Sequence, residues 1–426
     1  MKLLETVQVN MRKTMDSMTP LQYSWPQLPD RKPMPPLYQP LIFILTIIPF
    51  FFPSRRRIAI CVFPLILNLC LRSPCYTFGN PSADYYNSSF FIAAPLWFLE
   101  FAILSPQKGP GAPACIGNPK HNGASSERTL DDMNLSWQKV LRVCSLMVPS
   151  HRGIGWNWQV KGIPDDPYDG FSKRAFVGRH ARKMMIAYLR SMGMLVLLGW
   201  GSAAEIRLSS EARPYHLIVD ALIGWSGAIW VWDRLNFAYS FMAAVSVATG
   251  VCETWQWPPL MGKLRDAWSV RQVWSVVHHQ TMRKMVSQPA VRIVRLLGLR
   301  KGSLASGCTQ LYVSFALSCL VHEFQMFMVM RRDMGELVFF MSQPVAITIE
   351  GVVQWIAVHT RYRGAGHDNI GRALARYAGY IWVVLWFSFS LPTYVKGCRD
   401  AGIVHDAIFG DRPFEAGVRL ASWMLL

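Results

Sequence analysis

A histidine, His322, lies near the middle of an apolar stretch that is long enough to cross a lipid bilayer as a helix. The stretch runs from Gln310 to Met330 and has the sequence QLYVSFALSCLVHEFQMFMVM. Burying an imidazole in hydrocarbon costs a few kcal/mol unless the ring is paired or faces a polar cavity. Because a neutral imidazole can also accept a proton from a hydroxyl group, this position predicts a reaction centre or a polar pathway.

The polar residues of this stretch share one side of the predicted helix. They lie at i, i+4, i+8 and i+11 and are Ser314, Ser318, His322 and Gln325. Glu323 points elsewhere, so the group that orients His322 must come from another span or loop, and Glu350 on the next span is a candidate. For the serines alone, hydrogen bonds between helices are the simpler explanation.

A second region with residues that could take part in a reaction is the connection 254–309, which contains WSVRQVWSVVHHQTMRK. Its apolar residues are spaced so that they share one side of a helix, with the basic residues elsewhere. We therefore expect this segment to be an amphipathic helix along the membrane surface. His278 and His279 would point about 100° apart on such a helix and could not both address one site. Without other information, such histidines are more often packing or surface residues than catalysts.

The segment 151–164 has the sequence HRGIGWNWQVKGIP. Clustered glycines, two tryptophans and a terminal proline are typical of an ordered turn at the membrane interface. An anchor in the aromatic belt, without a chemical role, would have the same composition.

Composition favours an all-α, polytopic integral membrane protein. Of the 426 residues, 51% are hydrophobic and only 16% are charged, against about 25% in soluble domains. We expect seven to nine transmembrane helices, the first two of them short. The candidate spans are 39–53, 57–72, 88–105, 184–204, 214–232, 236–253, 310–330, 336–358 and 377–396. A polar tail, 1–38, would precede a single membrane-embedded domain, 39–426.

The formal net charge of +18 comes from basic residues between the apolar segments, not from a separate polar domain. This pattern argues against nucleic acid as a partner and for loops that set topology against an anionic lipid surface. The nine cysteines form no CxxC pair and no cluster with histidine, so no metal site is predicted.

Three segments carry a resemblance to a known family: RGIGWNWQVKGIP (152–164), VWSVVHHQTMRKMVSQP (273–289) and SFALSCLVHEF (314–324). Together they resemble the fungal wax synthase-like branch of the membrane-bound O-acyltransferases, over residues 150–400. That branch includes acetyltransferases of terpenoid and meroterpenoid pathways. The resemblance implies a fold like that of these acyltransferases, with the intramembrane His322 as the catalytic residue.

The resemblance also covers a family segment often written FWGRRWHQ, which aligns here with Val273 to Gln280. His279 then takes the second family position, and His278 replaces a tryptophan. The two family arginines are Val276 and Val277 in this chain. Any contact with the phosphates of a cosubstrate would therefore fall to Arg271, Arg283 or Lys284.

The reaction implied by the resemblance is the transfer of an acyl group, most simply acetyl, from acyl-CoA to an alcohol. His322 would act as the base and His279 or a nearby donor would stabilise the oxyanion. Acyl-CoA is a cosubstrate here and no bound cofactor is expected, since the thiolate of CoA leaves readily without a metal. The 254–309 connection has nine Lys and Arg, with Asp266 as its acidic residue, so we expect it to face the cytosol.

The acceptor would be a hydrophobic alcohol that arrives from the bilayer, and we expect the endoplasmic reticulum as the location. A hydroxylated terpenoid is favoured by the resemblance, and a long-chain alcohol, as in wax ester synthesis, is the nearest alternative. Two non-enzymatic hypotheses stay open at this point. The polar side of the 310–330 helix could line a transporter pathway, and the missing arginines would suit a membrane scaffold.

Overall fold

The computed structural model describes residues 25–117, 128–147, 152–164, 170–207, 213–361, 369–406 and 408–424. These residues are mostly helical. The α-helices are α2 (Tyr38–Ile47), α3 (Arg55–Arg72), α4 (Pro81–Phe98), α5 (Trp137–Met147), α6 (Lys173–Arg207), α7 (Arg213–Ala248), α8 (Val270–Gln272), α9 (Arg283–Leu296), α10 (Leu304–Met330), α11 (Glu336–Arg361), α12 (Asn369–Asp400) and α13 (Arg412–Met424). Two π-helical segments are η4 (Leu99–Leu104) and η7 (Val273–Val277).

The remaining elements are short. The 3-10 helices are η1 (Leu28–Asp30), η2 (Ile48–Phe51), η3 (Ser73–Cys75), η5 (Thr254–Gln256) and η6 (Leu264–Asp266). Strands β1 (Lys32–Pro33) and β2 (Tyr76–Thr77) pair in parallel, and β3 (Ala114–Cys115) and β4 (Arg128–Thr129) pair antiparallel. Each of these strands has two residues and pairs one loop with another. The prediction of a helical protein is therefore confirmed for the described residues.

Six helices among the described residues are long and apolar enough to cross a membrane. They span Arg55–Cys75, Pro81–Leu104, Lys173–Arg207, Leu304–Met330, Glu336–Ala357 and Ala373–Asp400. The number is below the predicted seven to nine because three predicted spans are not among the six. The predicted span 39–53 is a shorter apolar helical segment, Tyr38–Phe51. The predicted spans 214–232 and 236–253 form one continuous helix, α7, which is not one of the six.

The continuity of α7 has an electrostatic cause. Asp233 and Arg234 look like the polar end of a span in the sequence, but each finds a partner within the protein. Asp233 is fully buried and binds Arg190 of α6, and Arg234 lies 3.3 Å from the Asp406 carboxylate. Because both charges are paired, the helix continues through them.

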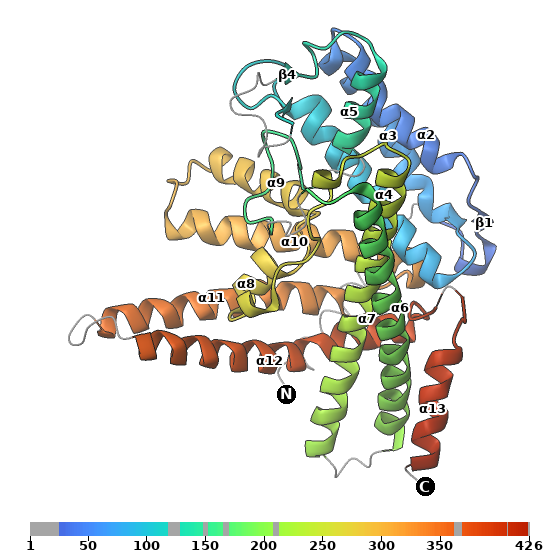
Figure 1. Cartoon of the computed structure of the whole chain (residues 1–426), viewed down its shortest axis with the longest axis vertical. Helices are drawn as coiled ribbons and strands as arrows, with labels where there is room; N and C mark the ends of the chain where they lie inside the picture. Colours follow the sequence, from blue (N-terminus) through green and yellow to red (C-terminus); the bar gives the residue numbers. More distant parts are fainter. Residues whose placement is uncertain are drawn as a thin grey trace.

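The helices cross in two directions (Figure 1). Helices α6 and α7 pack side by side as a long hairpin, with α13 against α6. Helices α10, α11 and α12 form a second layer that crosses this hairpin, with α12 packed on α7. Helix α4 packs on α10, and α2, α3 and α5 gather around α4 at the upper end of the molecule.

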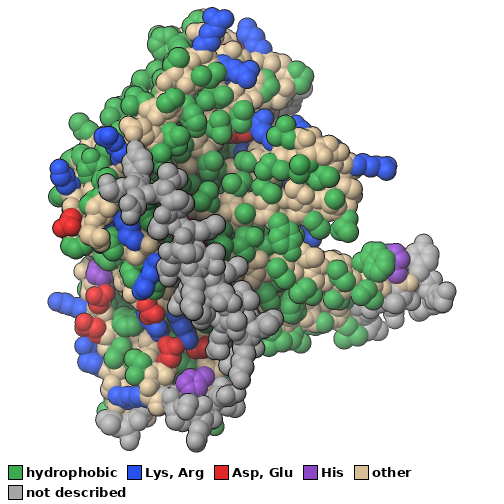
Figure 2. Space-filling view, turned by 180° about the vertical axis from the view of Figure 1, so that it is seen from behind, with side chains coloured by type: hydrophobic (Ala, Val, Ile, Leu, Met, Phe, Trp, Pro, Cys, Tyr) green, Lys and Arg blue, Asp and Glu red, His purple; other side chains and the backbone are tan. Residues whose placement is uncertain are grey.

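Hydrophobic side chains cover much of the outer surface, as Figure 2 shows for one face. Leu189 of α6, Val353 of α11 and Leu385 of α12 are 62%, 59% and 62% exposed, respectively. Exposed leucines and valines on long helices are costly in water and stable against lipid tails. The surface therefore fits a protein embedded in a bilayer.

The contact between α6 and α13 allows a test of this packing. A Cβ added at Gly199 of α6 would lie 2.0 Å from the Phe414 carbonyl oxygen, whereas a Cβ at Gly193 of the same helix would meet nothing within 4 Å. We expect Gly199→Ala to destabilise the protein by about 1–3 kcal/mol, because the helices must move apart. Gly193→Ala is the matched control. Thermal unfolding in detergent should show a lower midpoint for Gly199→Ala only, and equal midpoints would contradict the observed packing.

Candidate functional site

His322 lies on α10 where four helices meet. Its Nδ1 atom is 3.2 Å from the Tyr85 hydroxyl oxygen of α4, and that oxygen is 2.9 Å from the Tyr394 hydroxyl of α12. Phe340 of α11 stacks on the imidazole with 4.2 Å between ring centroids and 16° between planes. The histidine is thus held by a chain of two tyrosines on one side and by a stacked ring on another.

The residue that contacts His322 differs from the one predicted. Glu350 accepts hydrogen bonds from the backbone N–H groups of Val270 and Arg271 and, at 2.8 Å, from the Trp382 indole. It therefore caps the start of α8 and has its bonding capacity used there. The prediction that Glu350 orients His322 is wrong, and Tyr85 is the group that the sequence analysis missed. The sequence signal for it is only a tyrosine in the apolar helix α4, 237 residues before His322.

The predicted polar side of α10 is confirmed in part. Gln325 is buried and donates to the Tyr85 backbone carbonyl over 3.1 Å. Ser314 lies 3.4 Å from the Val286 carbonyl of α9. These side chains join α10 to its neighbours, which matches the role in helix packing considered for the serines.

The segment around the two adjacent histidines does not form a surface helix. Helix α8 lasts three residues, η7 follows as a π-helical turn, and His278 has an extended backbone with φ −71° and ψ 155°. Trp274 turns inward, where its indole donates to Gln343 of α11. The amphipathic interpretation of 268–284 is therefore wrong, because the segment is an irregular turn whose Trp274 finds a partner in the interior. An amphipathic helix does follow, as α9.

The π-turn and the extended residue after it change where the two histidines point. The His278 and His279 rings lie 4.2 Å apart, and both are close enough to His322 for electrostatic interaction. The expectation that they could not share one site assumed a regular helix and is wrong. Burial lowers the pKa of His278 to about 4, with a smaller contribution from His322. The His278 ring is thus neutral at pH 7.

Local contacts fix this segment tightly. The Gly262 N–H donates to the Val277 carbonyl over 2.8 Å, and a Cβ at Gly262 would lie 2.3 Å from the Val276 carbonyl oxygen. The Gln280 amide donates to the carbonyls of Trp274 and His278, and the Thr281 hydroxyl lies 2.8 Å from Nδ1 of His279. These contacts fix the backbone that carries the two histidines, and the Thr281 hydroxyl fixes the His279 ring.

The three predicted cosubstrate-binding cations lie in different surroundings. Arg271 is exposed, whereas Arg283 donates to the Ser275 carbonyl and to the Gln280 side chain. The Lys284 ammonium lies 5.6 Å from the centroid of the Trp158 ring. All three flank the histidine segment, with Arg271 on one side and Arg283 and Lys284 on the other.

A cavity of about 260 Å³ lies between α6, α7 and residues 259–261. Its lining includes His180, Lys183, Arg190, Trp232 and Asp233, and Asp233 is paired with Arg190. The Trp232 ring lies 6.3 Å from the His278 ring. The cavity is therefore separated from His278 by the Trp232 side chain.

The predicted ordered turn is confirmed for residues 152–164. Arg152 is buried and donates to the carbonyls of Pro258 and Pro259 and to the Tyr239 hydroxyl. Trp156 is 2% exposed, and Trp158 packs on Phe101. The tryptophans lie inside the protein, so the alternative of an outer aromatic anchor does not apply to them.

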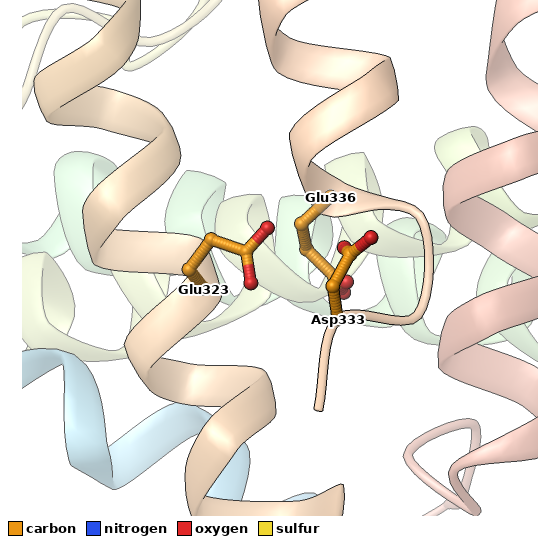
Figure 3. Close-up of side chains that lie close together, drawn as sticks. All are labelled: Glu323, Asp333 and Glu336. Atoms are coloured by element: carbon orange, nitrogen blue, oxygen red, sulfur yellow. The ribbon is translucent and has the colours of Figure 1, made fainter. Parts of the chain in front are cut away.

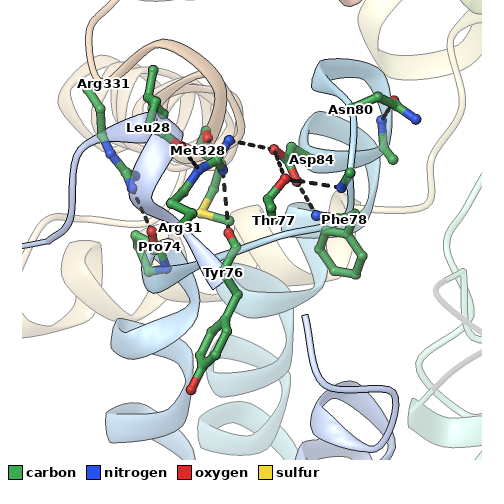
Figure 4. Close-up of polar contacts among 12 residues, drawn as sticks. Leu28, Arg31, Pro74, Tyr76, Thr77, Phe78, Asn80, Asp84, Met328 and Arg331 are labelled. Atoms are coloured by element: carbon green, nitrogen blue, oxygen red, sulfur yellow. Dashed lines mark hydrogen bonds and ion pairs between the residues drawn. The ribbon is translucent and has the colours of Figure 1, made fainter. Parts of the chain in front are cut away.

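An ionic network fixes the start of α4 close to Tyr85 (Figure 4). The Arg31 guanidinium lies 2.8 Å from the buried Asp84 carboxylate and donates to the Met328 carbonyl near the end of α10. Asp84 also accepts from the Thr77 hydroxyl and from the Phe78 N–H. Residues 25–37 thus contact the membrane domain instead of extending from it, and Arg31 links α4 to α10 through Asp84, the residue before Tyr85, and the Met328 carbonyl.

Comparison with known proteins places this geometry in context. Residues 257–342, which include all three histidines, match the model of the membrane bound O-acyl transferase family. An acetyltransferase, sirH, of Leptosphaeria maculans is 25% identical over 377 residues, which cover 85% of this chain and 91% of that protein. An acetyltransferase, eriL, of Hericium erinaceus is 30% identical over 80% of this chain and 85% of that protein. An O-mevalon transferase, macI, of Penicillium terrestre is 28% identical over 56% of this chain and 58% of that protein.

The Arg31–Asp84 pair is expected to stabilise the protein through charge compensation. Asp84 is 1% exposed, so Arg31→Met should leave an unpaired buried carboxylate and destabilise the protein by about 3–5 kcal/mol. The double variant Arg31→Met/Asp84→Asn should recover much of the loss. Lys108→Met is the control, because Lys108 and Asp132 are 74% and 50% exposed and their pair should contribute less than about 1 kcal/mol. Thermal unfolding midpoints measure the relative stabilities of the three variants. A double variant with a midpoint no higher than that of Arg31→Met would contradict charge compensation by this pair.

Proposed function

Because the chain belongs to the membrane bound O-acyl transferase family, we propose that it transfers an acetyl group from acetyl-CoA to a hydroxyl of a terpenoid or meroterpenoid intermediate. The protein is an acyltransferase of secondary metabolism embedded in a membrane, and its acetyltransferase relatives imply acyl-CoA as cosubstrate. The transporter and scaffold hypotheses are set aside, since full-length relatives are named as transferases. The observation that carries the proposal is the hydrogen-bonded contact of His322 with Tyr85, beside His278 and His279.

The contact with Tyr85 suits His322 to act as a base. If Nδ1–H donates to the Tyr85 oxygen and the Tyr85 hydroxyl donates to Tyr394, the lone pair of Nε2 is left for the substrate. Nε2 takes the proton of the acceptor hydroxyl as its oxygen attacks the thioester carbonyl carbon. The tetrahedral intermediate then collapses with cleavage of the C–S bond, and the imidazolium proton neutralises the CoA thiolate.

His279 is the proposed donor to the oxyanion, and His278 supports its ring. General-base catalysis contributes about 10²–10⁴-fold, so positioning of the two substrates and stabilisation of the oxyanion must supply the rest. The ring-to-ring contact and the backbone contacts of this segment hold the imidazole in place before the reaction starts. Such preorganisation is the basis of oxyanion stabilisation.

The cosubstrate is proposed to approach from the end at which α6 begins and α7 ends. Lys173 at the start of α6 lies 3.9 Å from Glu253, and Phe176 packs on Val247 and Trp257. The basic start of α6 thus meets the basic 254–309 connection at one end of the protein. Cationic connections favour the cytosolic side, where CoA is available. Arg271, Arg283 and Lys284 are the proposed phosphate contacts, because they flank the segment that holds His278 and His279.

The acceptor is proposed to enter from the bilayer, and the membrane is proposed to be that of the endoplasmic reticulum. A long-chain alcohol is the second candidate acceptor, since the same base and thioester chemistry would serve it. Among the relatives, two are named O-mevalon transferases, so transfer of a group other than acetyl is a further variant of the same reaction.

Removal of the base is the central test. Membranes with His322→Ala, offered acetyl-CoA and a panel of hydroxylated terpenoids and fatty alcohols, should form ester at least about 100-fold more slowly than wild type. His359→Ala is a matched control, because His359 is an exposed histidine on the neighbouring helix α11. Product is measured by mass spectrometry at equal expression. Equal rates in wild type and a well-expressed His322→Ala would contradict the assignment of the base.

Tyr85 is expected to position His322 without touching the substrate. Tyr85→Phe should lower kcat about tenfold and leave KM for both substrates unchanged, since only the partner of Nδ1 is lost. Tyr394→Phe should have a smaller effect, because its hydroxyl contacts Tyr85 and not the imidazole. Steady-state kinetics and pH–rate profiles separate this role from simple packing. An unchanged kcat and an unchanged pH profile in Tyr85→Phe would show that the hydroxyl is dispensable.

A further inference from the structure

Three carboxylates converge where α10 turns into α11 (Figure 3). Glu323 is the residue after His322, Asp333 lies in the turn, and Glu336 is the first residue of α11. One oxygen from each residue lies within 4.8 Å of an oxygen of the other two. Three like charges at this spacing repel one another strongly unless something compensates them.

The side chains around the carboxylates supply little compensation. Glu336 is fully buried, and its Oε1 atom has no hydrogen-bond partner. Glu323 Oε1 is buried and unpartnered as well. Within the part of the chain that the structure describes, no Lys or Arg forms an ion pair with any of the three. Leaving even one such carboxylate ionised and unpaired would cost several kcal/mol.

The backbone favours the ionised form of two of these groups. The Met334 N–H donates to Glu336 Oε2 over 3.0 Å, and the Gly335 N–H donates to Asp333 Oδ1 over 2.9 Å. The Leu337 N–H also lies 3.3 Å from Asp333 Oδ1. Hydrogen bonds from N–H groups stabilise a carboxylate more than a carboxylic acid. The turn therefore supplies N–H groups that stabilise carboxylates, while Oε1 of Glu323 and Oε1 of Glu336 are left without a hydrogen-bond partner.

We propose that Glu323, Asp333 and Glu336 bind one divalent cation, with Ca²⁺ preferred over Mg²⁺. Ca²⁺ binds oxygen ligands at about 2.3–2.6 Å, so ligands on opposite sides of the ion lie about 4.6–5.2 Å apart. The three oxygens lie within 4.8 Å of one another, so one ion of this size can contact all of them. Ca²⁺ tolerates irregular oxygen geometry, whereas Mg²⁺ demands a near-ideal octahedron with opposite ligands only about 4.2 Å apart, so a site of carboxylates from two helices and a turn favours Ca²⁺. Water and backbone carbonyls of the turn would complete the coordination sphere.

The cation would brace the two helices that hold the histidine. Glu323 fixes α10 next to His322, and Glu336 lies one turn before Phe340, the residue stacked on the imidazole. A shared ion would thus fix the distance between α10 and α11 at the end close to the ring. The site is structural and takes no part in the acyl-transfer steps.

The test uses the full-length protein, purified in detergent and treated with EDTA before dialysis. Equilibrium dialysis with ⁴⁵Ca²⁺ should give one bound ion per chain, and Glu336→Gln should weaken binding about tenfold or more. Calcium at a hundredfold excess over its Kd should raise the unfolding midpoint of the wild type by about 3 °C, and that of the variant by much less. Mg²⁺ at the same concentration should produce a smaller shift.

Two further variants keep the test decisive. Asp333→Asn, in the partly exposed turn, repeats the measurement if Glu336→Gln does not fold, and Glu415→Gln on the exposed face of α13 is the matched control. If the wild type binds no ion and shows no shift, the carboxyl groups share protons instead and the proposal is overturned. Equal binding by wild type and by both cluster variants would also overturn it, because the ion would then lie elsewhere.

Discussion

Polar groups inside this protein must find their partners within the protein, because the lipid around it offers none. That constraint explains contacts that would otherwise look unrelated. Glu350 takes up the first N–H groups of α8, Gln343 accepts from two tryptophan indoles, and Asp233 binds Arg190. Each pairing lets an irregular turn or a charged residue lie between apolar helices. The candidate site depends on these pairings, since none of its side chains could stay buried alone.

The site is assembled from segments far apart in the sequence. Tyr85 comes from α4, His322 from α10, Phe340 from α11 and Tyr394 from α12, while His278 and His279 lie on an irregular connection. Regular helices supply the base and its orienting tyrosines. The π-turn supplies the two neighbouring imidazoles, because only an interruption of the helix can bring both towards one point. The site thus combines His322 and the tyrosines from regular helices with His278 and His279 from an irregular connection.

The sequence predicted what depends on local composition and missed what depends on long-range pairing. The apolar stretches of α3, α4, α6, α10, α11 and α12 were recognisable because a spanning helix needs about 20 apolar residues. The prediction of two spans, 214–232 and 236–253, is wrong because Asp233 and Arg234 are charged residues between apolar stretches, and one sequence does not show their distant partners. The surface helix at 268–284 was wrong for a related reason, since amphipathic spacing does not show that Trp274 has a buried acceptor. His322 stands out because an ionisable side chain is rare in an apolar span, whereas Tyr85 resembles any tyrosine of such a span.

The length of the α6–α7 hairpin has a consequence for the membrane itself. At 1.5 Å per residue, the 36 residues of α7 extend over about 54 Å, and the hydrocarbon layer is only about 30 Å thick. The hairpin must therefore lean steeply or stand clear of the lipid at one end. Its basic end, with Lys173, Arg179 and Lys183, is suited to phosphate headgroups and water. A helix longer than the layer is accommodated by tilting, so local lipid thickness becomes a variable that acts on the angle between this hairpin and the helices that cross it.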